Sequence, residues 1–303
     1  MDHPQQRAGI IAGLTAYAVW GLLTIYWKQL HRFDAFELIG WRVASSAVLM
    51  VAVITVVHRW AAVRAVVRDR RLLGRVALAA VLLTVNWTCY VYAVVHDHVL
   101  ETALGYFIAP IGTVMVGVLV LHEPLRRAQR VSLVFAVASV VVLTISYGRP
   151  PWLALLIAVS WVSYGYLKKH VPLQPIESMA AESWLLAPFA GVLVAVTASG
   201  SSSIPSSADG RELAFVLLTG VATVVPLTLF AFAAQRVKLT IIGPMQYIVP
   251  SMNFLIGWLL YDEPLPVVRV VGFALVWTGL AVLTADTWHR TRRSAPVPVE
   301  PAC

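Results

Sequence analysis

Long apolar segments separated by short polar loops recur along the whole chain. About 20 apolar residues are needed for a helix to cross the hydrocarbon core of a bilayer, and each segment is close to that length. We therefore predict an all-α polytopic membrane protein with ten transmembrane helices. The predicted spans are residues 8–28, 35–57, 73–95, 99–121, 129–147, 150–167, 176–198, 212–234, 239–261 and 266–286.

Composition agrees with a membrane protein and excludes several other classes. Of the 303 residues, 59% are hydrophobic and only 13% are charged, whereas soluble domains have about 25% charged residues. The net charge of +8 comes from basic residues in short loops between apolar segments, so we do not predict a nucleic-acid partner. The first apolar segment is a full span rather than a cleavable signal peptide. The cluster at residues 96–98 (HDH) is interpreted as a solvated turn, and no metal site is predicted.

The distribution of Lys and Arg among the loops predicts the orientation. With the N-terminus inside, 17 of the 23 basic residues lie on the inner side, five lie outside and Arg42 lies within a span. Positive charge is retained on the cytoplasmic side of membrane proteins. We therefore predict a protein of the bacterial inner membrane with both termini in the cytoplasm. The Ser-rich stretch 199–207 is then an external loop, and the Pro-rich tail at 291–303 is expected to be disordered.

The two halves of the chain align on each other at an offset of 140 residues. Residues 122–125 (HEPL) align with residues 262–265 (DEPL), and Pro110 aligns with Pro250. The shared glutamates Glu123 and Glu263 are interpreted as helix-end features. Five spans in each half require the second half to be inverted in the membrane, an arrangement that is common in secondary transporters. The predicted repeats around a central cavity are residues 1–147 and 148–290.

Several stretches, in order along the chain, carry a family pattern. These stretches are residues 17–26 (YAVWGLLTIY), 37–42 (ELIGWR), 86–110, 161–168, 226–230, 246–250 (QYIVP) and 272–286. Together they resemble the RarD-type permeases of the EamA family, within the drug/metabolite transporter superfamily. The resemblance implies a ten-helix bundle with a central cavity, and export or exchange of small metabolites or drugs. Thr24 and Ala109 depart from the family pattern, which has Pro and Asn there, and these departures bear on the substrate.

Charged side chains within spans are the first candidates for substrate binding, because each costs about 2.5–3.5 kcal/mol at a helix centre on insertion scales. Arg42 and Glu182 lie well inside spans at equivalent positions of the two repeats, and Glu37 and Glu177 form a second equivalent pair. Arg42 is predicted to point into the bundle and bind an anionic group through two contacts. Glu182 is predicted to bind a cation or a coupling proton. The alternative is that these charges only satisfy neighbouring groups. Inversion places Arg42 and Glu182 on opposite sides of the midplane, so we do not expect a direct salt bridge.

Polar and aromatic residues within the spans form a second group of candidates. Such groups need hydrogen-bonding partners away from lipid and are expected to face the interior, either to line a cavity or to join helices. The candidates are Trp20, Asn86, Tyr90, Tyr106, Gln246, Tyr247 and Asn253. Prolines within spans each remove a backbone hydrogen bond and are candidate hinges. The predicted hinges are Pro110, Pro226 and Pro250.

These observations predict a secondary transporter of a small organic metabolite or drug that works by alternating access, with or without a coupling ion or proton. The alternative is an integral membrane enzyme acting on a lipid or isoprenoid substrate. Such an enzyme usually has clustered carboxylates or histidines at one membrane face, and this sequence has none. There is also no phosphate-binding loop, HExxH motif or Ser-His-Asp arrangement. We therefore predict a protein that is not an enzyme and needs no cofactor.

Overall fold

The computed structural model is all-helical over the residues that it describes, which are 3–95, 99–148, 150–198, 200, 203–262 and 267–293. The helices are α1 (His3–Lys28), α2 (Ala35–Val56), α3 (Trp60–Arg68), α4 (Arg70–Val95), α5 (Val99–Leu119), α6 (Arg127–Tyr147), α7 (Trp152–His170), α8 (Pro175–Thr197), α9 (Ile204–Ser207), α10 (Gly210–Arg236), α11 (Leu239–Met245), α12 (Ile248–Tyr261) and α13 (Val267–Arg293). Nine segments of this described part are long and apolar enough to cross a membrane, with α11 and α12 counted as one segment. The prediction of an all-α polytopic membrane protein is confirmed.

Several helix ends follow from local sequence. The carboxylate of Asp34 accepts hydrogen bonds from two backbone N–H groups in the first turn of α2, and Asp209 accepts one in the first turn of α10. These bonds satisfy N–H groups that have no partner inside the helix. Gly148 ends α6 with a φ of 75°, a left-handed conformation that glycine adopts without steric cost.

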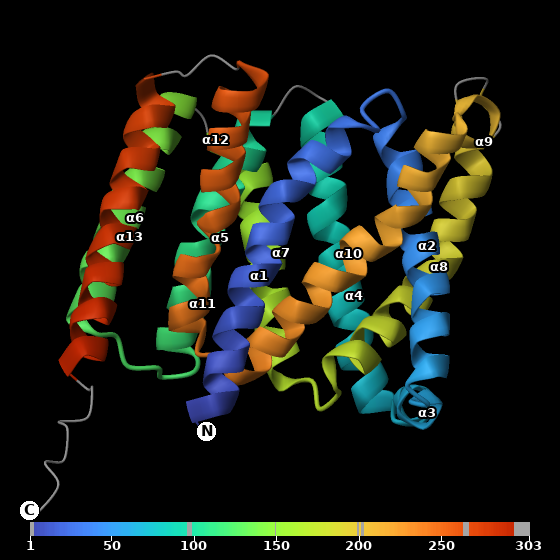
Figure 1. The fold of residues 1–303 in the computed structure, drawn as a ribbon, viewed down its shortest axis with the longest axis horizontal. Helices are drawn as coiled ribbons and strands as arrows, with labels where there is room; N and C mark the ends of the chain where they lie inside the picture. Colours follow the sequence, from blue (N-terminus) through green and yellow to red (C-terminus); the bar gives the residue numbers. More distant parts are fainter. Residues whose placement is uncertain are drawn as a thin grey trace, which may run out of the picture.

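The helices form one bundle whose two edges differ (Figure 1). The start of α1 and the end of α13 lie at the same edge, together with α3, and α9 lies at the opposite edge. The α6–α13 pair forms one end of the bundle and the α2–α8 pair the other, with α1, α4, α5, α7 and α10 between them. The first and last helices therefore share an edge with the arginine-rich segment that contains α3.

Helix α7 corresponds to the sixth predicted span but is not among the nine apolar segments. It has 19 residues, and Lys168, Lys169 and His170 occupy its last turn. It nevertheless packs against α4, α5 and α10 in the middle of the bundle. Its surroundings are thus those of a spanning helix, although its composition is more polar.

Two features of the fold differ from the predicted elements. The region predicted as an inner loop after the second span contains α3, an amphipathic helix whose Val63 and Val66 are buried against α4 and α8. Trp60 of this helix stacks on Trp184 at 5.1 Å. The predicted span 239–261 is divided into α11 and α12 by a break at residues 246–247.

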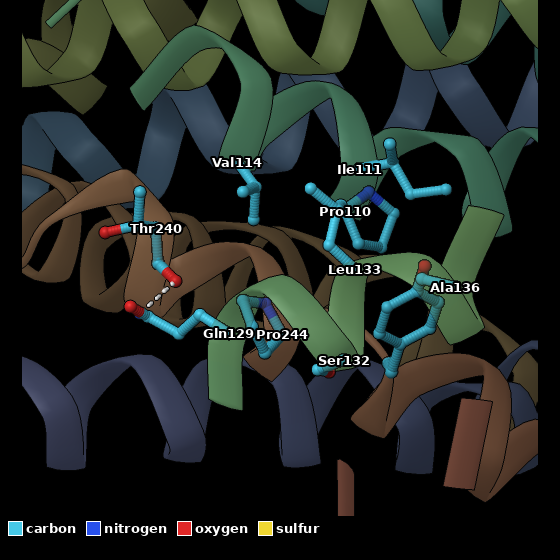
Figure 2. A pocket seen from close by; sticks show the side chains of 10 residues that line it. Pro110, Ile111, Val114, Gln129, Ser132, Leu133, Ala136, Thr240 and Pro244 are labelled. Carbon is cyan, nitrogen blue, oxygen red and sulfur yellow. Dashed lines mark hydrogen bonds between the residues drawn. The ribbon is translucent and has the colours of Figure 1, made fainter. Parts of the chain in front are cut away.

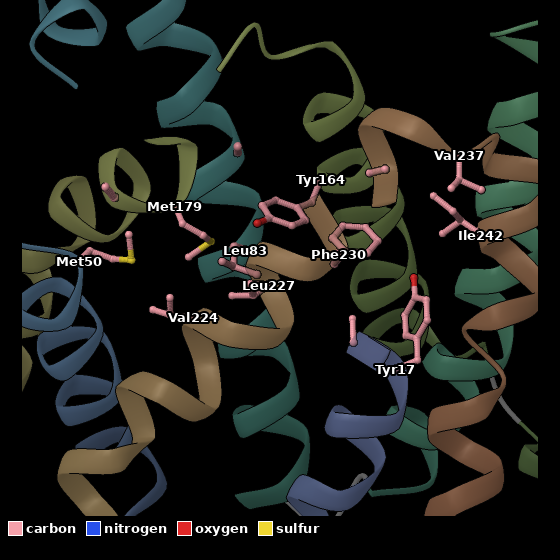
Figure 3. Packing of buried hydrophobic residues seen from close by; sticks show 14 of the residues in the cluster. Tyr17, Met50, Leu83, Tyr164, Met179, Val224, Leu227, Phe230, Val237 and Ile242 are labelled. Atoms are coloured by element: carbon pink, nitrogen blue, oxygen red, sulfur yellow. The ribbon is translucent and has the colours of Figure 1, made fainter. Parts of the chain in front are cut away.

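The main buried cluster joins helices from both halves of the chain (Figure 3). Tyr17 of α1, Tyr164 of α7 and Phe230 of α10 meet there, and the Tyr164 and Phe230 rings are stacked with centroids 6.1 Å apart.

Small residues allow neighbouring helices to approach closely. A Cβ atom at Gly220 of α10 would lie 2.7 Å from the carbonyl carbon of Ser45 in α2. Such close packing stabilises helix pairs in lipid, where the hydrophobic effect does not.

Candidate functional site

The guanidinium of Arg42 is surrounded by aromatic side chains. Its Cζ atom lies 3.8 Å from the ring centroid of Trp87 on α4 and 5.5 Å from that of Trp27 on α1. Tyr90 follows Trp87 by three residues on the same face of α4, and its ring lies 6.2 Å from that of Tyr106 on α5. We call these five residues the Arg42 cluster. Because α1, α4 and α5 all contribute to it, Arg42 points into the bundle.

Arg42 has no ion-pair partner in the described part of the chain. Its Nε atom is buried without a hydrogen-bond partner, and the residue as a whole is only half-buried. The two terminal nitrogens make no hydrogen bond to the described residues and keep some accessible surface. The guanidinium therefore has donors available for another molecule.

Glu182, the repeat equivalent of Arg42, is fully engaged. One carboxylate oxygen accepts hydrogen bonds from Lys168 and Ser178, and the other accepts one from the Tyr164 hydroxyl at 3.2 Å. The Lys168 and Glu182 side chains are each 1% exposed. As expected, Glu182 does not pair with Arg42.

The position of Lys168 corrects the sequence interpretation, which assigned it to an inner loop. Lys168 directly follows the predicted span 150–167, and a charge at such a position usually indicates that a span has ended. The structure instead buries it inside α7, against α8. The one sequence signal for this burial is a carboxylate, Glu182, 14 residues later on the following helix.

Glu37 and Glu177 have reciprocal structural contacts at the starts of α2 and α8. Glu37 accepts a hydrogen bond from the backbone N–H of Ile204, in the segment after α8, at 2.8 Å. Glu177 accepts one from Arg59, in the segment after α2, at 3.3 Å. Each glutamate thus joins the start of one helix to the chain beyond the other.

Trp20 lies in the middle of the bundle rather than in the Arg42 cluster. Its ring meets that of Trp161 edge to face at 5.4 Å, and Tyr17 and Phe230 are within 6.0 Å of it. Trp20 and Trp161 are near-equivalent residues of the two repeats, separated by 141 positions. The two halves of the chain therefore meet through these tryptophans.

Most of the predicted polar candidates join helices. Asn86 donates to the carbonyl of Ile157 at 2.8 Å and so links α4 to α7. Asn253 accepts a hydrogen bond from Thr24 at 2.7 Å. Thr24 thus supplies a donor that links α1 to α12.

Gln246 and Tyr247 lie at the break between α11 and α12. Gln246 donates to the hydroxyl of Thr113 at 2.8 Å, and Tyr247 donates to the carbonyl of Phe107 at 3.0 Å. Both bonds tie the break to α5. Of the predicted binding residues, the structure gathers Arg42, Tyr90 and Tyr106 in one cluster and places the others elsewhere.

The predicted hinge prolines lie in different settings. Pro110 and Pro226 are inside α5 and α10, whereas Pro250 is in the first turn of α12, where a missing N–H costs little. A small pocket lies beside Pro110, between α5, α6 and α11 (Figure 2). Gln129 at its edge donates to the carbonyl of Thr240 at 3.1 Å. This mainly apolar pocket does not include the Arg42 cluster.

The structure also shows what Glu123 does. Its two carboxylate oxygens accept hydrogen bonds from the backbone N–H groups of Leu239 and Thr240, at 3.1 and 2.9 Å, and so cap the start of α11. Glu263, its repeat equivalent, lies outside the described residues, as does the 96–98 cluster. Among the described residues, no group of three His, Cys, Asp or Glu side chains is placed to hold a metal ion.

Comparisons with known proteins agree on one family. The model of the EamA-like transporter family matches residues 7–145 and 150–285. Protein RarD of Streptomyces exfoliatus is 40% identical over 291 residues, which cover 96% of this chain and 92% of the relative. The uncharacterized transporter YojE of Bacillus subtilis is 33% identical, with 97% and 100% covered. A crystal structure with 17% identity shares the fold at a TM-score of 0.68, covering 91% of this chain and 97% of its own. The chain belongs to the EamA-like transporter family and is a multi-pass membrane transporter.

Proposed function

We propose that this chain is a secondary transporter that moves a small organic molecule across the bacterial inner membrane by alternating access. The two moving units are inverted five-helix repeats, with α7 as the tenth span. No nucleotide-binding motif is present in the sequence to drive transport with ATP. The family membership supports transport, and the arrangement of helices supports the mechanism.

The observation that carries the proposal is the reciprocal packing of equivalent helices. At the 140-residue offset, α2 corresponds to α8, α6 to α13, and α5 to α11–α12. In each of these three cases a helix packs directly on its own equivalent. The contact of α1 with α10 is also matched by the contact of α4 with α7. Such pairing is expected when a two-fold axis relates the halves.

Individual residues support the same axis. Tyr247 donates a hydrogen bond to the carbonyl of Phe107, its own equivalent 140 positions earlier. The equivalent glutamates Glu37 and Glu177 make reciprocal contacts to the chain beyond the partner helix. Contacts between a residue and its own equivalent are expected only near a symmetry axis.

The proposed orientation places both termini in the cytoplasm. The start of α1 and the end of α13 share an edge with α3 (Figure 1), and the basic residues are concentrated in loops assigned to this side. The Arg42 cluster then lies in the outer half, because α2 begins at the opposite edge. In the proposed mechanism this cluster contacts the substrate, and Pro110, Pro226 and the α11–α12 break absorb the bending.

The proposal can be tested by locking the two repeats together at the outer side. Thr24 and Asn253 are in hydrogen-bond contact between α1 and α12, so Thr24→Cys and Asn253→Cys can be cross-linked by oxidation in a variant carrying Cys89→Ser and Cys303→Ser. A counterflow screen of amino acids, nucleosides and antibiotics in proteoliposomes first supplies a transported solute. We expect oxidation to abolish its uptake, reduction to restore it, and the two single-cysteine variants to be unaffected. Unchanged uptake after complete cross-linking would contradict alternating access.

A further inference from the structure

We infer that the Arg42 cluster selects organic anions in which a carboxylate is attached to a planar, apolar body. The inference rests on the proposed function, because it names the substrate class of the proposed transporter. It is drawn from the charge balance, the geometry of the guanidinium and the aromatic side chains around it.

Among the residues that the structure describes, the charge balance leaves Arg42 without a counter-ion. No described carboxylate lies within salt-bridge distance of it, and the equivalent carboxylate of Glu182 is occupied by Lys168. Charged groups inside transmembrane segments are costly unless they pair. A bound anion would supply the missing partner and would be strongly preferred over a neutral solute of the same shape.

The geometry favours a planar anionic group. The ring centroid of Trp87 lies 3.8 Å from the Cζ atom of the guanidinium. The N–H donors of a guanidinium lie in its plane, and those of the two terminal nitrogens make no hydrogen bond to the described residues. A carboxylate presents two coplanar oxygens that match this fork, so two parallel hydrogen bonds can form. The cluster contains a single positive charge, which matches a carboxylate monoanion rather than a phosphate dianion.

The surroundings of the charge favour an apolar ring on the substrate. The other four members of the cluster are Trp27, Trp87, Tyr90 and Tyr106, and Tyr90 is 40% exposed. Aromatic side chains bind other rings by offset stacking or edge-to-face contact. An aromatic carboxylate can therefore satisfy the guanidinium with one end and the aromatic rings with the other.

The test is a matched series of probes on the purified full-length chain in detergent. Benzoate, benzamide, benzylamine and phenyl phosphate share one ring and differ in the charge and shape of the head group. Binding is measured from tryptophan fluorescence, since Trp27 and Trp87 flank the charge, and from thermal stabilisation. We expect benzoate to bind most tightly, with benzamide at least about tenfold weaker, because a hydrogen bond to a charged group contributes enough for such a factor.

Variants show whether Arg42 is responsible. Arg42→Lys keeps the charge but loses the planar fork, and we expect it to lose benzoate affinity by about tenfold or more. Arg211→Gln is the control, since Arg211 is an exposed arginine at the start of α10, and its benzoate affinity should be unchanged. If Arg42→Lys does not fold, as judged by helical circular dichroism, the probe series on the unmodified chain decides alone.

Each outcome has a definite meaning. Equal binding of benzoate and benzamide, no binding of benzoate, tighter binding of phenyl phosphate, or full affinity in Arg42→Lys would overturn the inference. Counterflow transport that persists in any of these cases would leave the proposed function standing. Benzoate selectivity without an effect of the Thr24–Asn253 cross-link on transport would instead remove alternating access and keep the binding site.

Discussion

Replacing Lys168 by Met should destabilise the protein far more than loss of a surface charge. The change leaves the carboxylate of Glu182, which is 1% exposed, without its positive partner. Removing one member of a buried ion pair typically costs about 3–5 kcal/mol, because the remaining charge is buried and uncompensated. Ser178 and Tyr164 still donate to the carboxylate, but neither carries a charge. We expect a loss within this range, and a similar loss for Glu182→Leu.

The double variant Lys168→Met with Glu182→Leu separates the ion pair from its surroundings. Both charges are then absent, and the hydroxyls of Tyr164 and Ser178 lose their acceptor. A serine inside a helix can donate to the carbonyl four residues earlier instead, so the main remaining cost is the Tyr164 hydroxyl, about 1–3 kcal/mol. The double variant should therefore be more stable than either single variant, which corresponds to a coupling energy of at least about 3 kcal/mol. The free energy of unfolding is measured by titration with SDS in mixed micelles, with helical circular dichroism as the readout.

The matched control is the more exposed pair Arg126–Asp286, whose nitrogen and oxygen atoms are 3.2 Å apart and whose side chains are 36% and 24% exposed. Arg126→Gln should cost about 0–1 kcal/mol. A cost of this size for Lys168→Met, or a double variant whose loss equals the sum of the single losses, would refute the argument that burial makes the Lys168–Glu182 pair critical.

Two further predictions concern packing and topology. Gly243→Ala places a Cβ atom 2.8 Å from the carbonyl oxygen of Pro110 and 2.5 Å from Val114, so overpacking should lower the free energy of unfolding by about 1–3 kcal/mol. The control is Gly191→Ala, whose Cβ atom has nothing within 4 Å and which should be neutral or slightly stabilising in the same unfolding assay. Equal effects of the two substitutions would contradict this packing. A topology reporter fused after Cys303 should report a cytoplasmic position, and one inserted at Ser202 should report an external position. The reason is that 17 basic residues lie on the predicted inner side and five on the outer side. The reverse pair of results would overturn the orientation.

The apolar pattern of the sequence predicts the helices well wherever a segment is uniformly apolar. The second span was expected at 35–57 and is Ala35–Val56, and the fifth was expected at 129–147 and is Arg127–Tyr147. Helix α3 was missed because its arginines gave the segment the composition of a loop. Its Trp60, Val63 and Val66 recur every three residues, which is the helical signal that the segment did contain.

The site is less predictable, because a sequence lists polar groups without their partners. Arg42 could be singled out because an isolated charge in a span is costly wherever it lies. Asn86, Gln246 and Asn253 have the same polarity, but the register between neighbouring helices decides whether they line a space or bond to another helix. Lys168 shows the opposite error: the end of an apolar segment does not mark the end of the buried region.

The two repeats have similar folds, but the charges at the equivalent positions 42 and 182 differ, and this difference leaves a binding site with one net positive charge. Position 42 in the first repeat is an arginine that has no described counter-ion, whereas position 182 in the second is a glutamate neutralised by Lys168. In the proposed mechanism an anion therefore meets one positive group in the outer half, and the buried Lys168–Glu182 pair adds no net charge in the inner half. A second unpaired cation on the same path would hold the anion more tightly and slow its release. The neutral Lys168–Glu182 pair thus fits a carrier that must release its substrate. For this reason, exchanging the charge at position 42 or 182 should change transport more than exchanging any other single charge in the spans.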